Sequence, residues 1–175
     1  RMRNSAGRGA GNANWEREHF PAVYDFCDVL VVGAGMAGMA AAIAAAADGL
    51  KVVIVEEQPR PGGNSNYEIW NKPEVTNMPR DLKKVIAKQQ NIELRTSTTA
   101  VGYYADHWVA LVDQQRLTKM RARSVILATG AIEQPAVFGN NDLPGVMLAT
   151  AALRLVSPYA VKPFKKIGRA HVCNP

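Results

Sequence analysis

Residues 28–56 read DVLVVGAGMAGMAAAIAAAADGLKVVIVE, and this stretch decides the fold. It opens with a nearly continuous apolar run over residues 28–32, which is typical of a strand buried on both faces of a parallel sheet. A glycine-rich turn follows, and then an alanine-rich helix that ends near Ala47. A second apolar run over 52–55 closes at Glu56. Strand, turn, helix and strand within about 30 residues make a βαβ unit.

The turn has the pattern Gly-x-Gly-x-x-Gly, with Gly33, Gly35 and Gly38 at its three glycine positions. The first glycine allows the tight turn, the second lets a pyrophosphate approach the backbone, and the third lets the helix pack closely on the strand. Seventeen residues separate Gly38 from Glu56, so the carboxylate lies at the end of the second strand, where it can accept hydrogen bonds from an adenosine ribose. A glycine turn without a ligand is the alternative, and this context argues against it. The stretch predicts a site for one adenine dinucleotide.

Glu56 also restricts which dinucleotide is expected. A carboxylate at the ribose 2′-hydroxyl repels a 2′-phosphate, so NADP is disfavoured and the cofactor is FAD or NAD. Arg60 lies four residues on and would oppose this repulsion, but an arginine in a loop is better explained as a solvated side chain.

The remaining patterns predict an α/β fold with a Rossmann-like FAD/NAD(P)-binding domain. Its parallel sheet is covered by helices on one face and by a three-stranded antiparallel meander on the other. We expect mostly loop over 59–79, then a helix over 79–90, a strand over 92–96, the meander over 98–122, a strand over 124–127 and a helix over 147–156. We expect the sheet to be incomplete, with an uncovered edge around Val125, Ile126 and Leu127.

Two later groups of small residues resemble flavoproteins with two dinucleotide domains: Gly62-Gly63 and Ala128-Thr129-Gly130. Either group alone is explained by an ordinary turn, but their order, with a meander between them, favours a binding role. Disulfide reductases of this architecture carry a redox-active cysteine pair, whereas Gly62-Gly63 is followed here by Asn64-Ser65-Asn66-Tyr67, so thiol chemistry is not expected. The residues expected to contact the dinucleotide are Gly33, Gly35, Met36, Ala37, Gly38, Glu56, Glu57, Gln58, Gly62, Gly63, Ala100, Thr129 and Gly130.

The net charge of +6 would suit a nucleic-acid partner, but the positive charge is located at the two ends of the chain. Residues 1–20 hold a surplus of two positive charges and residues 162–175 a surplus of four, which accounts for all of it. The 141 residues between them hold 13 basic and 13 acidic side chains. A neutral globular part argues against a surface that follows nucleic-acid phosphates.

Cysteine usage and hydropathy favour a cytoplasmic protein without a membrane partner. Cys27 is the only cysteine apart from Cys173 near the end, and this suits a reducing compartment. The longest apolar run, residues 36–47, is shorter than the ~20 residues of a transmembrane helix. No metal site is expected, because His171 and Cys173 are only two ligands. The catalytic residues stay unknown, since His107 at the head of a strand is better explained as a turn residue.

The chain divides into three parts. Residues 1–20 have no apolar period and predict a lead-in or linker. Residues 21–166 form the FAD/NAD(P)-binding domain. Residues 167–175 begin with Ile-Gly-Arg-Ala-His-Val, which resembles one translated frame of a sequencing-library adaptor. We interpret this tail as non-native, and a native loop with the same sequence is the alternative.

The sequence resembles the alpha subunit of heterotetrameric sarcosine oxidase and related FAD/NAD(P)-binding subunits of amine and amino-acid oxidoreductases. The resemblance is carried by residues 24–38, by TAVGYY at 99–104, and above all by ATGAIEQPAVFGNNDLPGVML at 128–148. It covers residues 24–163 and is weakest over 64–91.

The resemblance implies a fragment of a larger oxidoreductase subunit that acts on a CH–NH donor and whose substrate site lies outside this segment. It implies partner subunits of a hetero-oligomeric oxidase or dehydrogenase and a small amine or amino-acid substrate, with oxidative demethylation of sarcosine as the first expectation. Relatives that act on opines, proline or glycine are similar here as well. A dinucleotide held as a structural or regulatory ligand is a third interpretation.

The interpretation of the tail is tested by resequencing the source DNA. We expect the reading frame to depart from this sequence at about residue 167, because the tail matches an adaptor and carries part of the excess charge. Genomic DNA that encodes residues 167–175 in frame and continues would contradict this, and His171 and Cys173 would then need a new interpretation.

Overall fold

The described chain begins with strands that alternate with helices, continues with four consecutive strands and ends with a helix. The computed structural model describes residues 21–67 and 73–165, so the expected lead-in at 1–20 and the expected tail at 167–175 lie outside the described residues. The elements are β1 (Ala22–Val32), α2 (Met36–Ala47), β2 (Val52–Val55), η1 (Gly63–Asn66), α3 (Pro73–Lys88), β3 (Ile92–Arg95), β4 (Thr99–Tyr104), η2 (Ala105–His107), β5 (Trp108–Val112), β6 (Leu117–Leu127) and α4 (Ala149–Tyr159).

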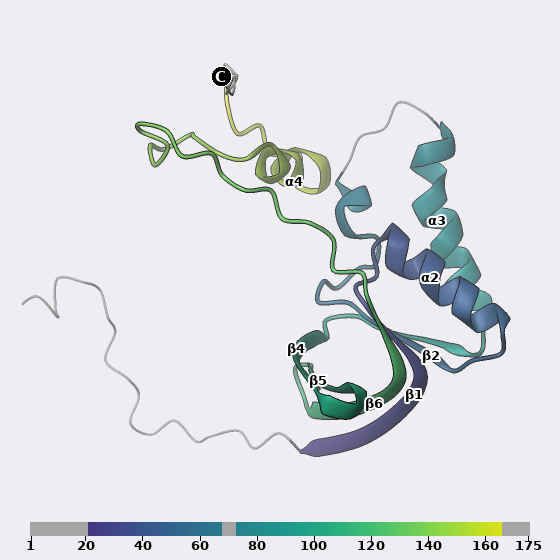
Figure 1. The fold of residues 1–175 in the computed structure, drawn as a ribbon. Coiled ribbons are helices and arrows are strands. Elements are labelled where there is room, and N and C mark those ends of the chain that lie inside the picture. Colours follow the sequence, from purple (N-terminus) through teal and green to yellow (C-terminus); the bar gives the residue numbers. More distant parts are fainter. Residues whose placement is uncertain (1–20, 68–72, 166–175) are drawn as a thin grey trace, which may run out of the picture.

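The described strands form one six-stranded sheet in the order β3-β2-β1-β6-β5-β4. The first four strands in that order pair in parallel, and β5 and β4 continue the sheet in antiparallel pairing. Figure 1 shows β1 and β6 as long curved strands that run side by side, with α2 and α3 together and away from β4 and β5. The parallel sheet and the antiparallel meander are therefore two ends of one sheet.

Two strands differ from the sequence prediction. β1 begins at Ala22 rather than at residue 28, and β6 is one strand where we predicted a meander strand followed by a separate buried strand. The first six residues of β1 pair with the first six of β6. Exposed and buried side chains are mixed there, so no local apolar run marks the pairing. The prediction was wrong because these residues form a strand through pairing with residues about 95 positions later in the chain, which no local pattern reveals.

Buried apolar side chains form two groups, one on each face of the sheet. The helix-face group consists of Val29, Val31, Ala34, Met39, Ala42, Ala46, Val52, Ile54, Ile86 and Ile92. The meander-face group consists of Cys27, Leu30, Val53, Val55, Val109, Leu111, Met120 and Ala122. Helices cover one face and the meander covers the other, which confirms the predicted layers. Burial of each large apolar side chain stabilises the fold by roughly 1.5–3 kcal/mol.

Helix α3 begins six residues earlier than predicted, at Pro73 instead of Pro79. Proline at the first position of a helix loses no hydrogen bond, so Pro73 suits the start. Pro79 lies inside the helix, where it forgoes one backbone hydrogen bond, and it is buried. The loop predicted over 59–79 is therefore shorter than expected. Among residues 21–67 and 73–165, no helix is long and apolar enough to cross a membrane.

The end of β6 is an open edge of the sheet. β5 pairs with β6 only as far as Arg121, so among the described residues 124–127 have β1 as their only strand neighbour. Leu127 is 69% exposed, whereas Val125 and Ile126 are half-buried. The expected uncovered edge is present but smaller than predicted, because only one of its three apolar side chains protrudes.

An ion-pair cluster joins β1 to β3 across the sheet. The Arg95 guanidinium contacts the Asp25 carboxylate and donates to Glu93 at 2.7 Å, and Lys51 Nζ lies 3.7 Å from Asp25. Burial alone would raise the pKa of Asp25. Hydrogen bonds from Arg95 and from the backbone N–H of Phe26, with the charges of Arg95 and Lys51, outweigh burial and hold this pKa below its ordinary value.

We expect Asp25→Asn to lower the free energy of unfolding by about 1–2 kcal/mol at pH 7, between the values for exposed and buried ion pairs. A lowered pKa stabilises the folded state above the ordinary value of 3.8 and loses that effect as pH falls below it. The gap between wild type and variant should therefore close under acid conditions, as measured by denaturant unfolding from pH 7 to pH 3.

The matched control is Asp81→Asn, which removes an exposed carboxylate paired with Lys84 on α3 and should change stability by less than about 0.5 kcal/mol. If the stability difference between wild type and Asp25→Asn stays constant down to pH 3, the lowered pKa of Asp25 is contradicted.

Candidate dinucleotide-binding site

Two glycines of the turn after β1 are required by the packing of the protein itself. Gly33 has φ +103°, and a Cβ there would lie 2.3 Å from the carbonyl oxygen of Ala128. A Cβ on Gly38 would lie 1.9 Å from the carbonyl oxygen of Gly33. Both distances are far below contact distance, so a larger residue at Gly33 forces the turn away from the segment after β6, and one at Gly38 forces α2 away from the turn. The predicted roles of Gly33 in the tight turn and Gly38 in helix packing are confirmed.

Gly35 is different, because the protein itself does not require a glycine there. Its φ is −69°, and no atom lies within 4 Å of the position that a Cβ would take. Gly35 is also the N-cap of α2, where it offers no side-chain hydrogen bond, and no acidic residue stands in the first turn of the helix. The N–H groups at the start of α2 and their partial positive charge are thus open to an anionic group that needs close approach to the backbone.

Glu56 is buried at the end of β2 and is bonded to the turn. Its Oε2 accepts a hydrogen bond from the Ala34 N–H at 2.8 Å, and its Oε1 accepts one from the Gln58 N–H at 3.0 Å. A carboxylate oxygen can accept more than one hydrogen bond, so Glu56 keeps acceptor capacity toward the groove that it lines. The sequence predicted its place but not its bond to the turn.

The segment over 62–67 lies against the turn. The Gly62 N–H donates to the Ala34 carbonyl at 2.7 Å, and Gly63 lies so close to Gly35 that a Cβ would be 3.2 Å from its Cα. Asn66 holds this segment in shape, because its side-chain amide donates to the Pro61 carbonyl at 3.2 Å. The second glycine pair therefore forms one wall of the space in front of α2.

These segments surround a groove of about 640 Å³. Every residue that we predicted as a contact lines it, except Gly38, which packs under the turn. Their contact with a ligand stays a prediction. The sequence missed a further set of lining residues: Val32, Val55, Asn64, Ser65, Asn66, Tyr67, Thr98, Thr99, Ala128, Ala131, Ile132 and Arg154.

The missed residues differ in how far a sequence signal could have found them. Thr98 and Thr99 follow the parallel strand β3, and ligands bind beyond the carboxyl ends of such strands, so their position was a usable signal. Arg154 lies on α4, more than 110 residues after the turn, and no local pattern places it at the groove.

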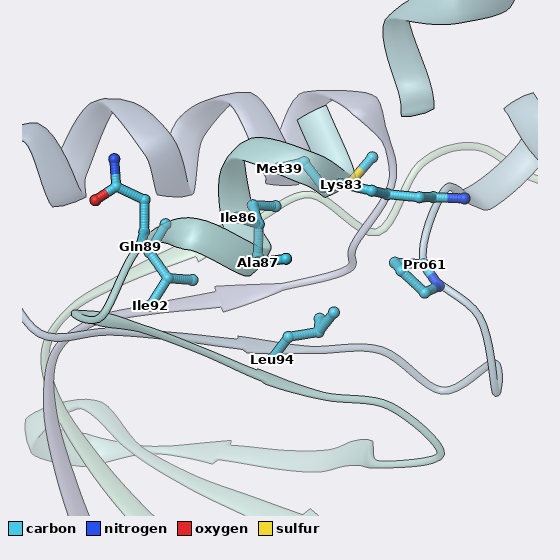
Figure 2. A pocket seen from close by; sticks show the side chains of 8 residues that line it. All are labelled: Met39, Pro61, Lys83, Ile86, Ala87, Gln89, Ile92 and Leu94. Carbon is cyan, nitrogen blue, oxygen red and sulfur yellow. The ribbon is translucent and has the colours of Figure 1, made fainter. Parts of the chain in front are cut away.

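A second hollow of about 360 Å³ lies elsewhere, against α3 and the edge strand β3. Figure 2 shows its lining, with Ile86 and Ala87 facing Ile92 and Leu94, and with Lys83 extended toward the loop that holds Pro61. Lys83 Nζ donates to Asn66 Oδ1 at 3.1 Å, which ties α3 to the wall of the groove. The hollow is mainly aliphatic and contains none of the predicted contact residues.

Cys27, the cysteine among the described residues, is fully buried on the meander face. Burial raises the pKa of its thiol to about 11, so it is a thiol rather than a thiolate near neutral pH. Cys27 therefore serves as a small apolar residue of the core, and Cys173 lies outside the described residues.

The fold and the groove are those of a domain of the dinucleotide-binding class. A family model described as pyridine nucleotide-disulphide oxidoreductase matches residues 27–163, and the chain belongs to this family.

The alpha subunit of sarcosine oxidase from Rhizobium meliloti (strain 1021) is 32% identical over 93% of this chain, and the match covers 18% of that protein. An opine oxidase subunit from Agrobacterium tumefaciens (strain Ach5) is 36% identical over 73% of this chain and 28% of its own length. The crystal structure of L-proline dehydrogenase from P. horikoshii superposes with a TM-score of 0.70 at 27% identity, over 86% of this chain and 32% of that one.

These matches confirm the predicted resemblance to the alpha subunits of sarcosine oxidases and to related oxidoreductase subunits. The chain spans less than a third of the length of each of these three proteins.

The contrast between Gly35 and Gly38 gives a paired test. We expect Gly35→Ala to leave the thermal unfolding of the ligand-free protein unchanged or slightly raised, while dinucleotide affinity falls at least tenfold because the Cβ occupies ligand space. We expect Gly38→Ala to destabilise the fold by several kcal/mol, because its Cβ meets backbone. The measurements are thermal unfolding and calorimetric titration with FAD and NAD.

A Gly35→Ala variant that binds as tightly as wild type would show that no ligand approaches this backbone. A Gly38→Ala variant of normal stability would show that the close contact with Gly33 relaxes easily.

Proposed function

We propose that residues 21–166 are the adenine-dinucleotide-binding domain of a flavin- or nicotinamide-dependent oxidoreductase subunit that acts on a CH–NH bond. The observation that carries the proposal is Gly35, a glycine that packing does not require, at the open N-terminus of α2 and on the lining of the groove. A pyrophosphate held at helix N–H groups needs this arrangement.

Residues of this chain would hold the cofactor in three places. The first turn of α2 would bind the pyrophosphate, Glu56 would accept hydrogen bonds from the adenosine ribose, and the glycines at 62–63 and Gly130 would let the backbone pass close to the dinucleotide. When bound, the cofactor supplies a ring that accepts or donates a hydride. The residues described here bind and orient it, and none of them is proposed as a catalytic acid or base.

The substrate is proposed from the relatives. The sarcosine oxidase, opine oxidase and L-proline dehydrogenase relatives are named for sarcosine, opines and proline, which are amino acids with a secondary amine nitrogen. We propose this substrate class, with oxidative demethylation of sarcosine as the first reaction to test and oxidation of opines or proline as the second. The sarcosine oxidase and opine oxidase relatives are both named as subunits, which supports a hetero-oligomeric enzyme in which other chains are the partners.

A dinucleotide with a structural or regulatory role is the alternative that leaves binding intact. Anaerobic addition of sarcosine, an opine and proline to the purified complex separates the two. Reduction of the dinucleotide of this subunit within the turnover time supports a redox role, and a dinucleotide that never changes its absorbance contradicts it.

Glu56 provides the test of the binding mode. In the full-length subunit we expect Glu56→Ala to weaken binding of the adenine dinucleotide by ~1–3 kcal/mol, the typical loss for hydrogen bonds to a charged group. Thermal stability should also fall, because Glu56 satisfies the buried N–H of Ala34. If the groove takes NAD, Glu56→Arg should relax discrimination against NADP. Calorimetric titration with FAD, NAD and NADP measures both effects.

The matched control is Asp81→Ala, which removes an exposed carboxylate of α3 outside the groove. It should not change the affinity for FAD, NAD or NADP. Unchanged affinity in both Glu56 variants would show that the end of β2 does not face the ligand.

A further inference from the structure

Arg154 is the one basic side chain among the described residues that line the groove. It comes from α4, which Figure 1 shows apart from α2 and α3. Its guanidinium carbon lies 5.2 Å from the centre of the Tyr67 ring, in cation–π geometry. Tyr67 ends the segment that begins at Gly62-Gly63 and lies against the turn. The guanidinium is thus held against Tyr67 at the wall of the groove.

Among the described residues that line the groove, the other two charged side chains are acidic, Glu56 and Glu57. A dinucleotide carries two negative charges on its pyrophosphate, and the partial charge at the start of α2, roughly half an elementary charge, compensates only part of them. Arg154 is the side chain in this lining that can supply a full positive charge. A guanidinium also matches two phosphate oxygens at once, which an ammonium group does not.

A contact at the start of α4, one turn before Arg154, restrains the helix that carries it. Glu133 Oε2 accepts hydrogen bonds from the Thr150 N–H at 3.0 Å and from the Thr150 hydroxyl at 2.6 Å. These bonds hold the pKa of Glu133 below its ordinary value. The N-cap residue Leu148 has an apolar side chain that cannot accept a hydrogen bond from the first turn of the helix. Glu133, which is distant in sequence, accepts that bond instead. Glu133 directly follows Ile132, which lines the groove, and Thr150 stands one turn before Arg154.

We infer that Arg154 binds the pyrophosphate of the dinucleotide from across the groove, and that the Glu133–Thr150 contact positions α4 so that it can do so. The inference rests on the proposed function, since it assigns a further residue to the same site. It gives the Gly-Ala-Ile-Glu part of the 128–148 segment a physical role, because its glutamate attaches α4 to the segment that lines the groove.

The test compares a ligand that contains a pyrophosphate with one that lacks it. The full-length subunit, freed of bound nucleotide, is titrated calorimetrically with ADP-ribose and with adenosine, each at low and high salt. We expect Arg154→Gln to weaken ADP-ribose binding about tenfold to a hundredfold, as for a lost hydrogen bond to a charged group, and to reduce its salt dependence. Adenosine affinity and ligand-free thermal unfolding should not change. Arg154→Lys should restore part of the loss.

The matched control is Arg116→Gln, which removes an arginine paired with Asp113 in the β5–β6 hairpin, outside the groove. It should leave both affinities unchanged. Glu133→Ala should weaken ADP-ribose binding by a smaller factor than Arg154→Gln, because it frees α4 without removing the charge.

The outcomes separate this inference from the proposed function. If wild type binds ADP-ribose and Arg154→Gln binds it equally well, the inference is overturned and the proposed function stands. An equal loss for ADP-ribose and adenosine would also overturn it, since the effect would then be structural. If wild type binds neither FAD, NAD nor ADP-ribose, the proposed function and the inference both fail.

Discussion

The backbone of Gly33 and Ala34 is held from every side, and the groove is the space left around it. The Gly33 N–H donates to a carbonyl of β2 at 2.8 Å, and the Ala34 N–H donates to the Glu56 carboxylate. The Ala34 carbonyl accepts from the N–H of Gly62, while the Ala128 carbonyl lies against Gly33 where a Cβ would be. The exit of β1, the end of β2, the second glycine pair and the exit of β6 therefore meet at one turn. A change that enlarges this turn moves all four segments at once.

The sequence predicts this centre well and the periphery poorly, for a physical reason. The strand, the glycines, the helix and Glu56 lie within 29 consecutive residues, and each has a local signature in apolar period, turn geometry or spacing. The first half of β1 has no such signature, because it is a strand only through pairing with β6. The start of α3 was missed because Pro79 suggested a boundary, although a helix can contain one proline. Arg154 reaches the groove through a contact with Tyr67, and a contact between residues 87 positions apart leaves no period to detect.

The length of β1 and β6 explains how one sheet has two differently covered faces. Over their second halves these strands belong to a parallel sheet, and α2 and α3 pack on one side of it. Over their first halves they continue into β5 and β4, and the β5 side chains Val109 and Leu111 join Leu30 and Val53 on the opposite side. The curvature of β1 and β6 (Figure 1) lets the meander pack over the sheet face opposite α2 and α3. The Asp25–Arg95 ion pair joins the early part of β1 to the end of β3, and so connects the two halves directly.

The same centre sets the polarity of the groove. Glu56 cannot turn away from an unsuitable ligand, because its two oxygens satisfy the N–H groups of Ala34 and Gln58, and releasing the first would leave a buried donor of the turn without a partner. The position of its carboxyl group is therefore fixed at that end of the groove, whereas the wall at Tyr67 and Arg154 carries a guanidinium. The dinucleotide proposed for this groove would present its ribose hydroxyls to Glu56 and its phosphates to Arg154. We expect exclusion of a 2′-phosphate to follow from the hydrogen bonding of the turn itself, so a variant such as Glu56→Arg that relaxes it also leaves the buried Ala34 N–H without its acceptor and lowers stability.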